Sequence, residues 1–201
     1  MTKLFRRRVP YHLEELKLID LKTSIHCSEQ LLSAMSQQCY IRNLTLTNVC
    51  FSDRSFDTLI RFLTDSKILR ELELSWCEVR QSSYSKLMEA LADNTQLHHL
   101  TLDWNFILEE KSQQQLNKQQ TADGTKLTLS NTNSQTVENL CKFIRLNWCL
   151  VSVNLQNMRL IDPAIRKITK ALKYALGVQS VNLTGNPGIA PDVIEFACSH
   201  L

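Results

Sequence analysis

The chain of 201 residues carries 23 Lys and Arg against 20 Asp and Glu, a net charge of +3, and it holds only four glycines. A charge this close to balance does not favour a nucleic-acid-binding protein, and so few glycines leave no room for a glycine-rich phosphate loop. No apolar run reaches the length of a signal peptide or a membrane span. Because no Pro-, Gly- or Ser-rich linker divides the chain, we expect a single domain over residues 13–201.

Residues 1–12 precede the first strand-like motif and are expected to form a basic N-terminal cap. The opening stretch MTKLFRRRVP contains no acidic residue, and Arg6, Arg7 and Arg8 are candidate contacts for an anionic partner. A mitochondrial targeting segment is the alternative, although this stretch lacks the serines and the length of an amphipathic presequence.

A strand-like motif with Leu, Ile or Val at its first, fourth and sixth positions recurs along the chain. The motifs begin at Leu13, Ile41, Leu69, Leu97, Leu150 and Val178, and the first four, like the last two, follow one another with a 28-residue spacing. A period of roughly 20 to 29 residues with this pattern is typical of a leucine-rich repeat solenoid. The predicted fold is therefore α/β, a curved horseshoe with a parallel sheet on the concave face and helices on the convex face.

Apolar residues with helical spacing follow three of these motifs, as expected for a helix packed behind each strand. They are Phe56, Leu59 and Leu63; Tyr84, Leu87 and Leu91; and Ile165, Ile168 and Leu172. The last of these helices is predicted to have Asp162 as its N-cap, Pro163 at its first position and Gly177 at its end.

The interval from Leu97 to Leu150 is nearly twice the regular spacing, so it admits either two short repeats or one repeat with an insertion. The segment GTKLTLSNT, beginning at Gly124, has leucines at the fourth and sixth positions and lacks only the first. We therefore predict seven repeats, with a degenerate fifth repeat at 124 and a loosely packed, glutamine-rich helix over 108–123. In the alternative, residues 109–133 form a loop.

The eighth position of the repeats runs Asp20, Asn48, Trp76, Trp104, Asn131, Asn157 and Gly185. Since side chains alternate along a strand, this column should flank the concave face and set two tryptophans on adjacent strands. An aromatic centre with a polar surround is typical of a protein-binding hot spot. The predicted protein contacts are Trp76, Trp104, Glu73, Asp103, His99, Asn48 and Asn131. In the alternative, each indole packs beneath the loop after it.

Catalytic and metal-binding motifs are not found in the sequence, which contains no His-Glu-x-x-His pattern and no evident nucleophile elbow. We therefore predict neither enzymatic activity nor a cofactor nor a metal site. His98, His99 and Asp103 do not form a ligand set with Cys77, because neighbouring strand side chains face opposite ways and Cys77 should be interior. Arg80, after the third strand, remains a candidate arginine finger towards a GTPase.

A charged helix face and the cysteines complete the sequence-based picture. Arg166, Lys167 and Lys170 lie on the outer side of one predicted helix, where they are either solvated or in contact with an anionic partner. Cys77 falls at the ninth, interior repeat position, and the seven cysteines show no spacing typical of a disulfide cap. Reduced thiols, and hence a cytoplasmic protein, are the favoured interpretation.

The motifs LTLTNVCF, LELSWCEV, LTLDWN and VNLTGNPGI resemble the ribonuclease-inhibitor subclass of leucine-rich repeats, shared by ribonuclease inhibitors, Ran GTPase-activating proteins, tropomodulins and several ciliary and centrosomal proteins. The polar interruption at 109–123, followed by LTLSNTN and VNLQNMRL, is similar to the repeat domain of the seventy-eight-kilodalton centrosomal protein family. The resemblance implies a cytoplasmic scaffold that binds protein partners at centrioles, cilia or another cytoskeletal assembly. A GTPase activator of the Ran-activator type and a subunit buried in a large assembly are the alternatives.

Overall fold

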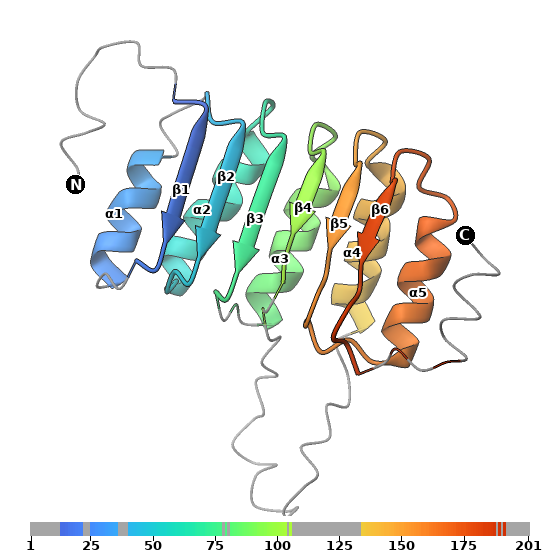
Figure 1. The fold of residues 1–201 in the computed structure, drawn as a ribbon. Coiled ribbons are helices and arrows are strands. Elements are labelled where there is room, and N and C mark those ends of the chain that lie inside the picture. Colours follow the sequence, from blue (N-terminus) through green and yellow to red (C-terminus); the bar gives the residue numbers. More distant parts are fainter. Residues whose placement is uncertain are drawn as a thin grey trace, which may run out of the picture.

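The structure of the protein, a computed structural model, describes residues 13–21, 25–35, 40–77, 79, 81–103, 105, 134–187, 189 and 191. Strands and helices alternate along these residues (Figure 1). In chain order the elements are β1 Glu15–Ile19, α1 Ile25–Met35, β2 Asn43–Thr47, α2 Asp53–Asp65, β3 Glu71–Ser75, α3 Gln81–Ala92, β4 His99–Thr101, α4 Ser134–Leu146, β5 Ser152–Asn154, α5 Asp162–Leu172 and β6 Ser180–Asn182. The described part of the chain therefore has the strand-then-helix order that the repeats predict.

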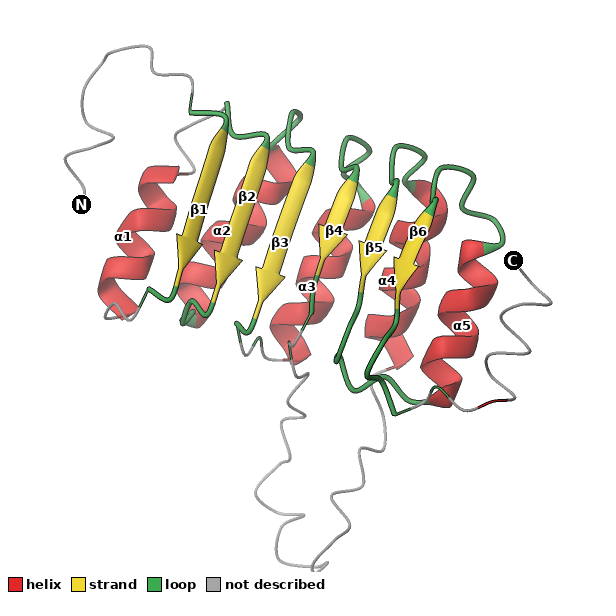
Figure 2. Cartoon of the chain, in the orientation of Figure 1, coloured by secondary structure: helices red, strands yellow, loops and turns green. Residues whose placement is uncertain are grey.

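The strands form one parallel sheet in which their order in space is their order in the chain. All the labelled helices lie on one side of this sheet, and the other side, here called the open face, carries none of the helices of the described residues (Figure 2). Leu16 is aligned with Leu44 and Leu44 with Leu72, so the 28-residue repeat of the sequence is also the register of the sheet. The predicted two-layer α/β architecture is confirmed, whereas the curvature of a horseshoe stays a prediction.

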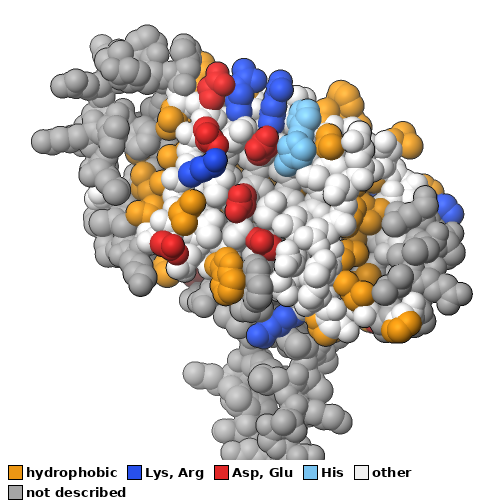
Figure 3. Space-filling view, viewed as in Figure 1, with side chains coloured by type: hydrophobic (Ala, Val, Ile, Leu, Met, Phe, Trp, Pro, Cys, Tyr) orange, Lys and Arg blue, Asp and Glu red, His pale blue; other side chains and the backbone are white. Residues whose placement is uncertain are grey.

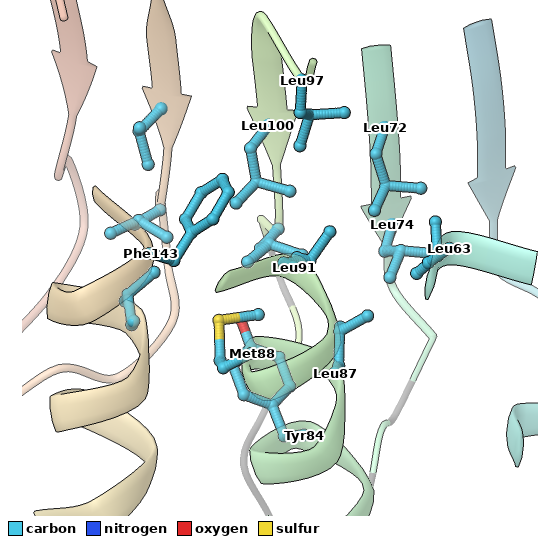
Figure 4. Packing of buried hydrophobic residues seen from close by; sticks show 14 of the residues in the cluster. Leu63, Leu72, Leu74, Tyr84, Leu87, Met88, Leu91, Leu97, Leu100 and Phe143 are labelled. Atoms are coloured by element: carbon cyan, nitrogen blue, oxygen red, sulfur yellow. The ribbon is translucent and has the colours of Figure 1, made fainter. Parts of the chain in front are cut away.

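The core consists of the apolar repeat positions and the inner sides of the helices. Leu72, Leu74 and Leu100 point from the sheet toward Leu63 of α2, Leu91 of α3 and Phe143 of α4 (Figure 4). Each fully buried leucine contributes about 2 kcal/mol through removal of apolar surface from water. The leucines of β1 and the valine of β6 are only partly buried, because an end repeat has one neighbouring repeat instead of two.

The helix positions predicted from the sequence are largely confirmed. The apolar sets predicted for α2, α3 and α5 are all buried, which confirms their helical periodicity. The cap of α5 needs a one-residue correction, because Ile161 is the N-cap and the Asp162 carboxylate accepts a hydrogen bond from Arg166 at 2.6 Å instead of capping. Gly177 lies beyond the end of α5, where a Cβ would come within 2.6 Å of the Trp148 carbonyl oxygen. Its role is close packing between two loops and not a helix cap.

The fourth repeat is where the sequence prediction needs its main correction. β4 pairs directly with β5, with Leu100 opposite Val153, so no fifth strand separates them. Behind these strands α4 packs against both α3 and α5, and it takes the place of the helix predicted over 108–123. Val137, Leu140 and Ile144 give α4 the buried apolar stripe that the glutamine-rich segment lacks. This arrangement agrees with the alternative of one repeat with an insertion. Residues 106–133 themselves lie outside the described residues.

Buried polar side chains at the ninth repeat position tie neighbouring repeats together. The Asn105 amide accepts a hydrogen bond from the backbone N–H of Cys77 at 2.8 Å and donates one to the Leu74 carbonyl. Asn186 repeats this pattern at the other end of the sheet, with its amide bonded to Leu155 and Leu160. Cys77 is buried, as predicted, and donates to the Leu46 carbonyl at 3.2 Å. These bonds satisfy backbone groups that would otherwise lie in the core without partners.

Candidate protein-binding face of the sheet

The open face of the sheet has a charged half and an uncharged half. Acidic and basic side chains gather over β1 to β4 in the space-filling view, and few lie over β5 and β6 (Figure 3). The outward positions of β1 to β4 are Glu15, Lys17, Ile19, Asn43, Thr45, Thr47, Glu71, Glu73, Ser75, His99 and Thr101, and those of β5 and β6 are Ser152, Asn154, Ser180 and Asn182. The repeat thus keeps the backbone constant while the chemistry changes along the sheet.

Two carboxylates on the charged half are held in place by neighbouring hydroxyl groups. Glu73 accepts hydrogen bonds from Thr45 at 3.5 Å and from Ser75 at 3.3 Å. The Ser75 hydroxyl also contacts the Asp103 carboxylate on the next repeat. Since one hydroxyl has one proton, it can satisfy only one of these carboxylates at a time. The remaining lone pairs of Glu73 and Asp103 are available to donors on a partner.

Charges on the neighbouring strands make this half of the face negative. Glu15 forms an ion pair with Lys17 at 2.7 Å. This contact raises the pKa of the Lys17 ammonium group, and the charges of Glu73 and Glu71 raise it further. Across the sheet Glu71 is aligned with His99, whose Nδ1 lies 2.7 Å from the Ser152 hydroxyl. A basic surface on a partner would complement this side of the sheet.

The eighth repeat position has an unusual backbone conformation in most repeats. Positive φ angles occur at Asp20, Asn48, Trp76, Asn157 and Gly185, which all occupy this position. The left-handed region is readily reached by Gly and, among other residues, most often by Asn and Asp. The turn extends the hydrogen bonding between neighbouring repeats beyond the ends of the strands. The N–H of Asn48 donates to the Ser75 carbonyl, and the N–H of Trp76 donates to the Asp103 carbonyl.

Trp76 is the exception within this column. Its φ of 57° places a bulky aromatic residue in a conformation that costs an ordinary residue about 1–2 kcal/mol. Its side chain is 48% exposed, so burial does not fully account for a tryptophan at this position. Asn48, beside it in the column, instead donates a hydrogen bond to Asp20 at 2.8 Å. A strained residue that keeps its indole half in solvent suggests a functional role, since strain tends to concentrate at binding sites.

Five of the predicted contact residues lie on or beside β2 to β4: Trp76, Glu73, Asp103, His99 and Asn48, of which Trp76, Asn48 and His99 are exposed. His99 is aligned with Glu71, five residues before Trp76, so it lies toward the other end of the strands. Trp104, Asn131, Arg6, Arg7, Arg8 and Arg80 lie outside the described residues. The sequence analysis missed the left-handed turn at Trp76, although a column rich in Asn, Asp and Gly is the signal that indicates it.

Other kinds of site find little support in the described residues. They contain no cluster of three or more His, Cys, Asp or Glu side chains suited to a metal ion. None of the helices in this part of the chain is long and apolar enough to cross a membrane. Cys50, Cys77, Cys141 and Cys149 are free thiols.

A parallel sheet of aligned repeats covered on one side by helices defines the class of the fold, a leucine-rich-repeat-like solenoid. The structure is similar to the tropomodulin C-terminal domain of Caenorhabditis elegans, with a TM-score of 0.58 and 14% identity over 89% of this chain and 92% of that one. It is also similar to leiomodin-1 actin-binding site 2, with a TM-score of 0.45 and 10% identity over 99% of this chain and 84% of that one. No family model and no curated protein matches the sequence.

These similarities concern the fold. At 14% identity, the likeness to the tropomodulin domain supports the predicted leucine-rich repeat architecture and nothing finer. The ribonuclease-inhibitor subclass and the likeness to the seventy-eight-kilodalton centrosomal protein family stay predictions. Function must therefore be argued from this chain's own surfaces.

Proposed function

We propose that the protein is a non-enzymatic scaffold that binds a protein partner through the open face of its sheet. The observation that carries the proposal is Trp76, an exposed residue held in a strained turn directly after Ser75, whose hydroxyl contacts the carboxylates of Glu73 and Asp103. Large aromatic side chains surrounded by polar groups dominate the energy of many protein interfaces. The expected partner surface is basic and contains an apolar recess for the indole.

The cellular setting is part of the same proposal. The resemblance of the repeat motifs supports a cytoplasmic scaffold in a cytoskeletal assembly, with the centrosome or cilium as the narrower suggestion. A Ran-type GTPase activator would need Arg80, which lies outside the described residues, so the geometry lends that alternative no support.

Affinity purification of the tagged full-length chain, followed by quantitative mass spectrometry, tests the proposal. Glu71→Lys reverses an exposed charge on β3, and Glu89→Lys makes the same change on the helical side, at an exposed position of α3. Partners of the open face should be depleted by Glu71→Lys and retained by Glu89→Lys, because only the first change alters the potential of that face.

A second variant separates the indole from the charge. Trp76→Asn places at this turn the residue found at Asn48 and Asn157, so the backbone should be unaffected while the indole is lost. We expect loss of the same partners, with the thermal unfolding midpoint as a check that the chain is folded. Retention of every partner by both Glu71→Lys and Trp76→Asn would refute the proposed site.

A further inference from the structure

A groove on the helical side of the molecule is chemically unlike the open face. It lies between α4 and α5, has a volume of about 640 Å³, and is called here the α4–α5 groove. Cys141 and Ala171, both buried, lie at its base, while exposed side chains of the two helices form its walls. A recessed base between two helices is the shape that accepts a side chain or a short peptide segment.

The walls of the groove are strongly basic. Lys142 and Arg145 come from α4 and Lys167 and Lys170 from α5, against a single lining carboxylate, Glu138. Four cations less one carboxylate leave a charge of +3, which equals the net charge of the whole chain. Glu138 is already paired with Lys167 at 3.1 Å, and among the described residues no carboxylate forms an ion pair with Lys142 or Arg145.

Stabilisation of the helix ends explains the presence of only some of these basic residues. Arg145 and Lys170 lie in the last turns of their helices, where a cation interacts favourably with the helix dipole. Lys142 and Lys167 lie further from the helix ends, and that benefit falls off within the last turn. The field of the groove also reaches its base, since Arg145 and Lys167 act to lower the pKa of the Cys141 thiol against the effect of burial.

Exposed apolar side chains continue the groove at its Arg145 end. Tyr174 lines the groove and is 65% exposed, and Leu146, Trp148 and Leu176 are 53%, 69% and 98% exposed. The two loops that carry Trp148 and Leu176 are in contact, as the packing of Gly177 against the Trp148 carbonyl shows. Exposed apolar residues rimmed by charge mark interaction sites more often than scattered single ones do.

We propose that the α4–α5 groove binds an acidic, amphipathic segment of a protein partner. Carboxylates of the segment pair with Lys142 and Arg145, and its apolar side chains cover Tyr174, Trp148 and Leu176. An amphipathic segment laid in a groove is an established mode of peptide recognition. A bilayer surface fits less well, because a flat membrane would meet the exposed loops and leave the recessed base at Cys141 unfilled.

The test measures binding of two labelled synthetic peptides to the full-length chain by fluorescence anisotropy. One peptide combines Glu with Leu and Phe at helical spacing, and the other replaces Leu and Phe with Ser at the same charge. The double variant Lys142→Glu, Arg145→Glu should weaken binding of the first peptide by about tenfold or more. Leu176→Ser, at a side chain that is 98% exposed, should weaken it by about two- to threefold without lowering the thermal unfolding midpoint.

A matched control guards against effects of net charge alone. Arg54→Glu, Arg61→Glu makes the same charge change on exposed positions of α2 and should leave the affinity within about twofold of the parent chain. Equal losses in the two double variants, equal affinity for the two peptides, or no binding of either peptide would each overturn the proposal. So would binding to phosphatidylserine vesicles or to polyphosphate that exceeds binding of the amphipathic peptide.

Discussion

The open face and the α4–α5 groove are built from the same repeats and carry opposite charges. On the open face, Glu71 and Glu73 lie on β3, Asp103 follows β4, and the exposed Trp76 lies in the turn after β3. In the groove, Lys142 and Lys167 face each other across neighbouring helices. The contrast teaches that a repeat determines where side chains emerge without determining their chemistry, because only the inward positions are constrained by packing.

The two surfaces should therefore respond in opposite directions to a change of charge. Added positive charge should weaken a partner of the open face, and added negative charge should weaken a partner of the groove. Raised salt should weaken both interactions, since the residues concerned are largely exposed and screened at short range. The two regions should also differ in buried polar contacts, in backbone strain and in local field.

The largest difference is expected from buried amides. Asn105→Ala removes the acceptor of the Cys77 N–H and the donor to the Leu74 carbonyl beneath the open face. Leaving two buried backbone groups unpaired should lower the free energy of unfolding by about 3 kcal/mol. Asn139→Ala in the groove loses a 3.4 Å bond to Ser85 and an exposed 3.0 Å bond from Gln135, and should cost about 1 kcal/mol because solvent can satisfy the groups left behind. Urea denaturation measures both, and equal losses would contradict the assigned contacts.

At Trp76 and Trp148, the tryptophans exposed among the described residues, the stabilities of the Gly and Ala variants should fall in opposite orders. At Trp76, where φ is 57°, the Gly variant should be more stable than the Ala variant by about 1 kcal/mol, because only Gly enters the left-handed region without cost. Trp148 is not among the positive-φ residues, so there the Ala variant should be the more stable by up to about 1 kcal/mol. Thermal unfolding of the four variants gives the order, and the same order at both sites would refute the strain at Trp76.

The smallest expected effect concerns two buried thiols. Burial raises the pKa of Cys77, beneath the open face, and that of Cys141, beneath the groove, from 9.0 to about 11. Because Arg145 opposes the rise at Cys141, Arg145→Gln should raise the pKa of Cys141 further and leave that of Cys77 unchanged. Site-resolved alkylation by iodoacetamide across pH, which reports the thiolate, should show the shift at Cys141 alone. An equal shift at both thiols would mean that the groove has no local field.

The raised pKa values of Cys77 and Cys141 predict that the folded chain loses stability at alkaline pH. Their folded pKa lies above the unfolded value, so the folded chain binds more protons between pH 9 and about 11. The contribution to stability is complete below pH 9 and is lost as the pH rises through the folded pKa. Cys77→Ala should reduce this alkaline loss, and urea denaturation at pH 8 and pH 10 would measure the difference.

Much of the fold is predictable because core positions are local and periodic. Leu44, Leu72 and Leu100 recur at one register and pair as expected, and Cys77 is interior. The predicted site is only partly placed: Glu73 lies on β3 and Trp76 in the turn after it, whereas Trp104 lies outside the described residues. The groove itself was not predicted: the sequence indicated only the charged helix face with Arg166, Lys167 and Lys170, since nothing in the local pattern indicates which helix lies beside α5.

The order of the leucines alone determined the class of fold, the register of the sheet and the inward face of each regular repeat, because these depend on spacing within a single repeat. Three-dimensional packing decided which strand lies next to β4. There β5 pairs directly with β4 and α4 packs against α3, although Leu100 and Val153 are almost two repeat lengths apart in the chain. Contacts between segments this distant depend on which apolar stripe can fill the core. The spacing of residues within one repeat does not indicate which segment that is. The same packing created the α4–α5 groove, whose two walls come from neighbouring repeats.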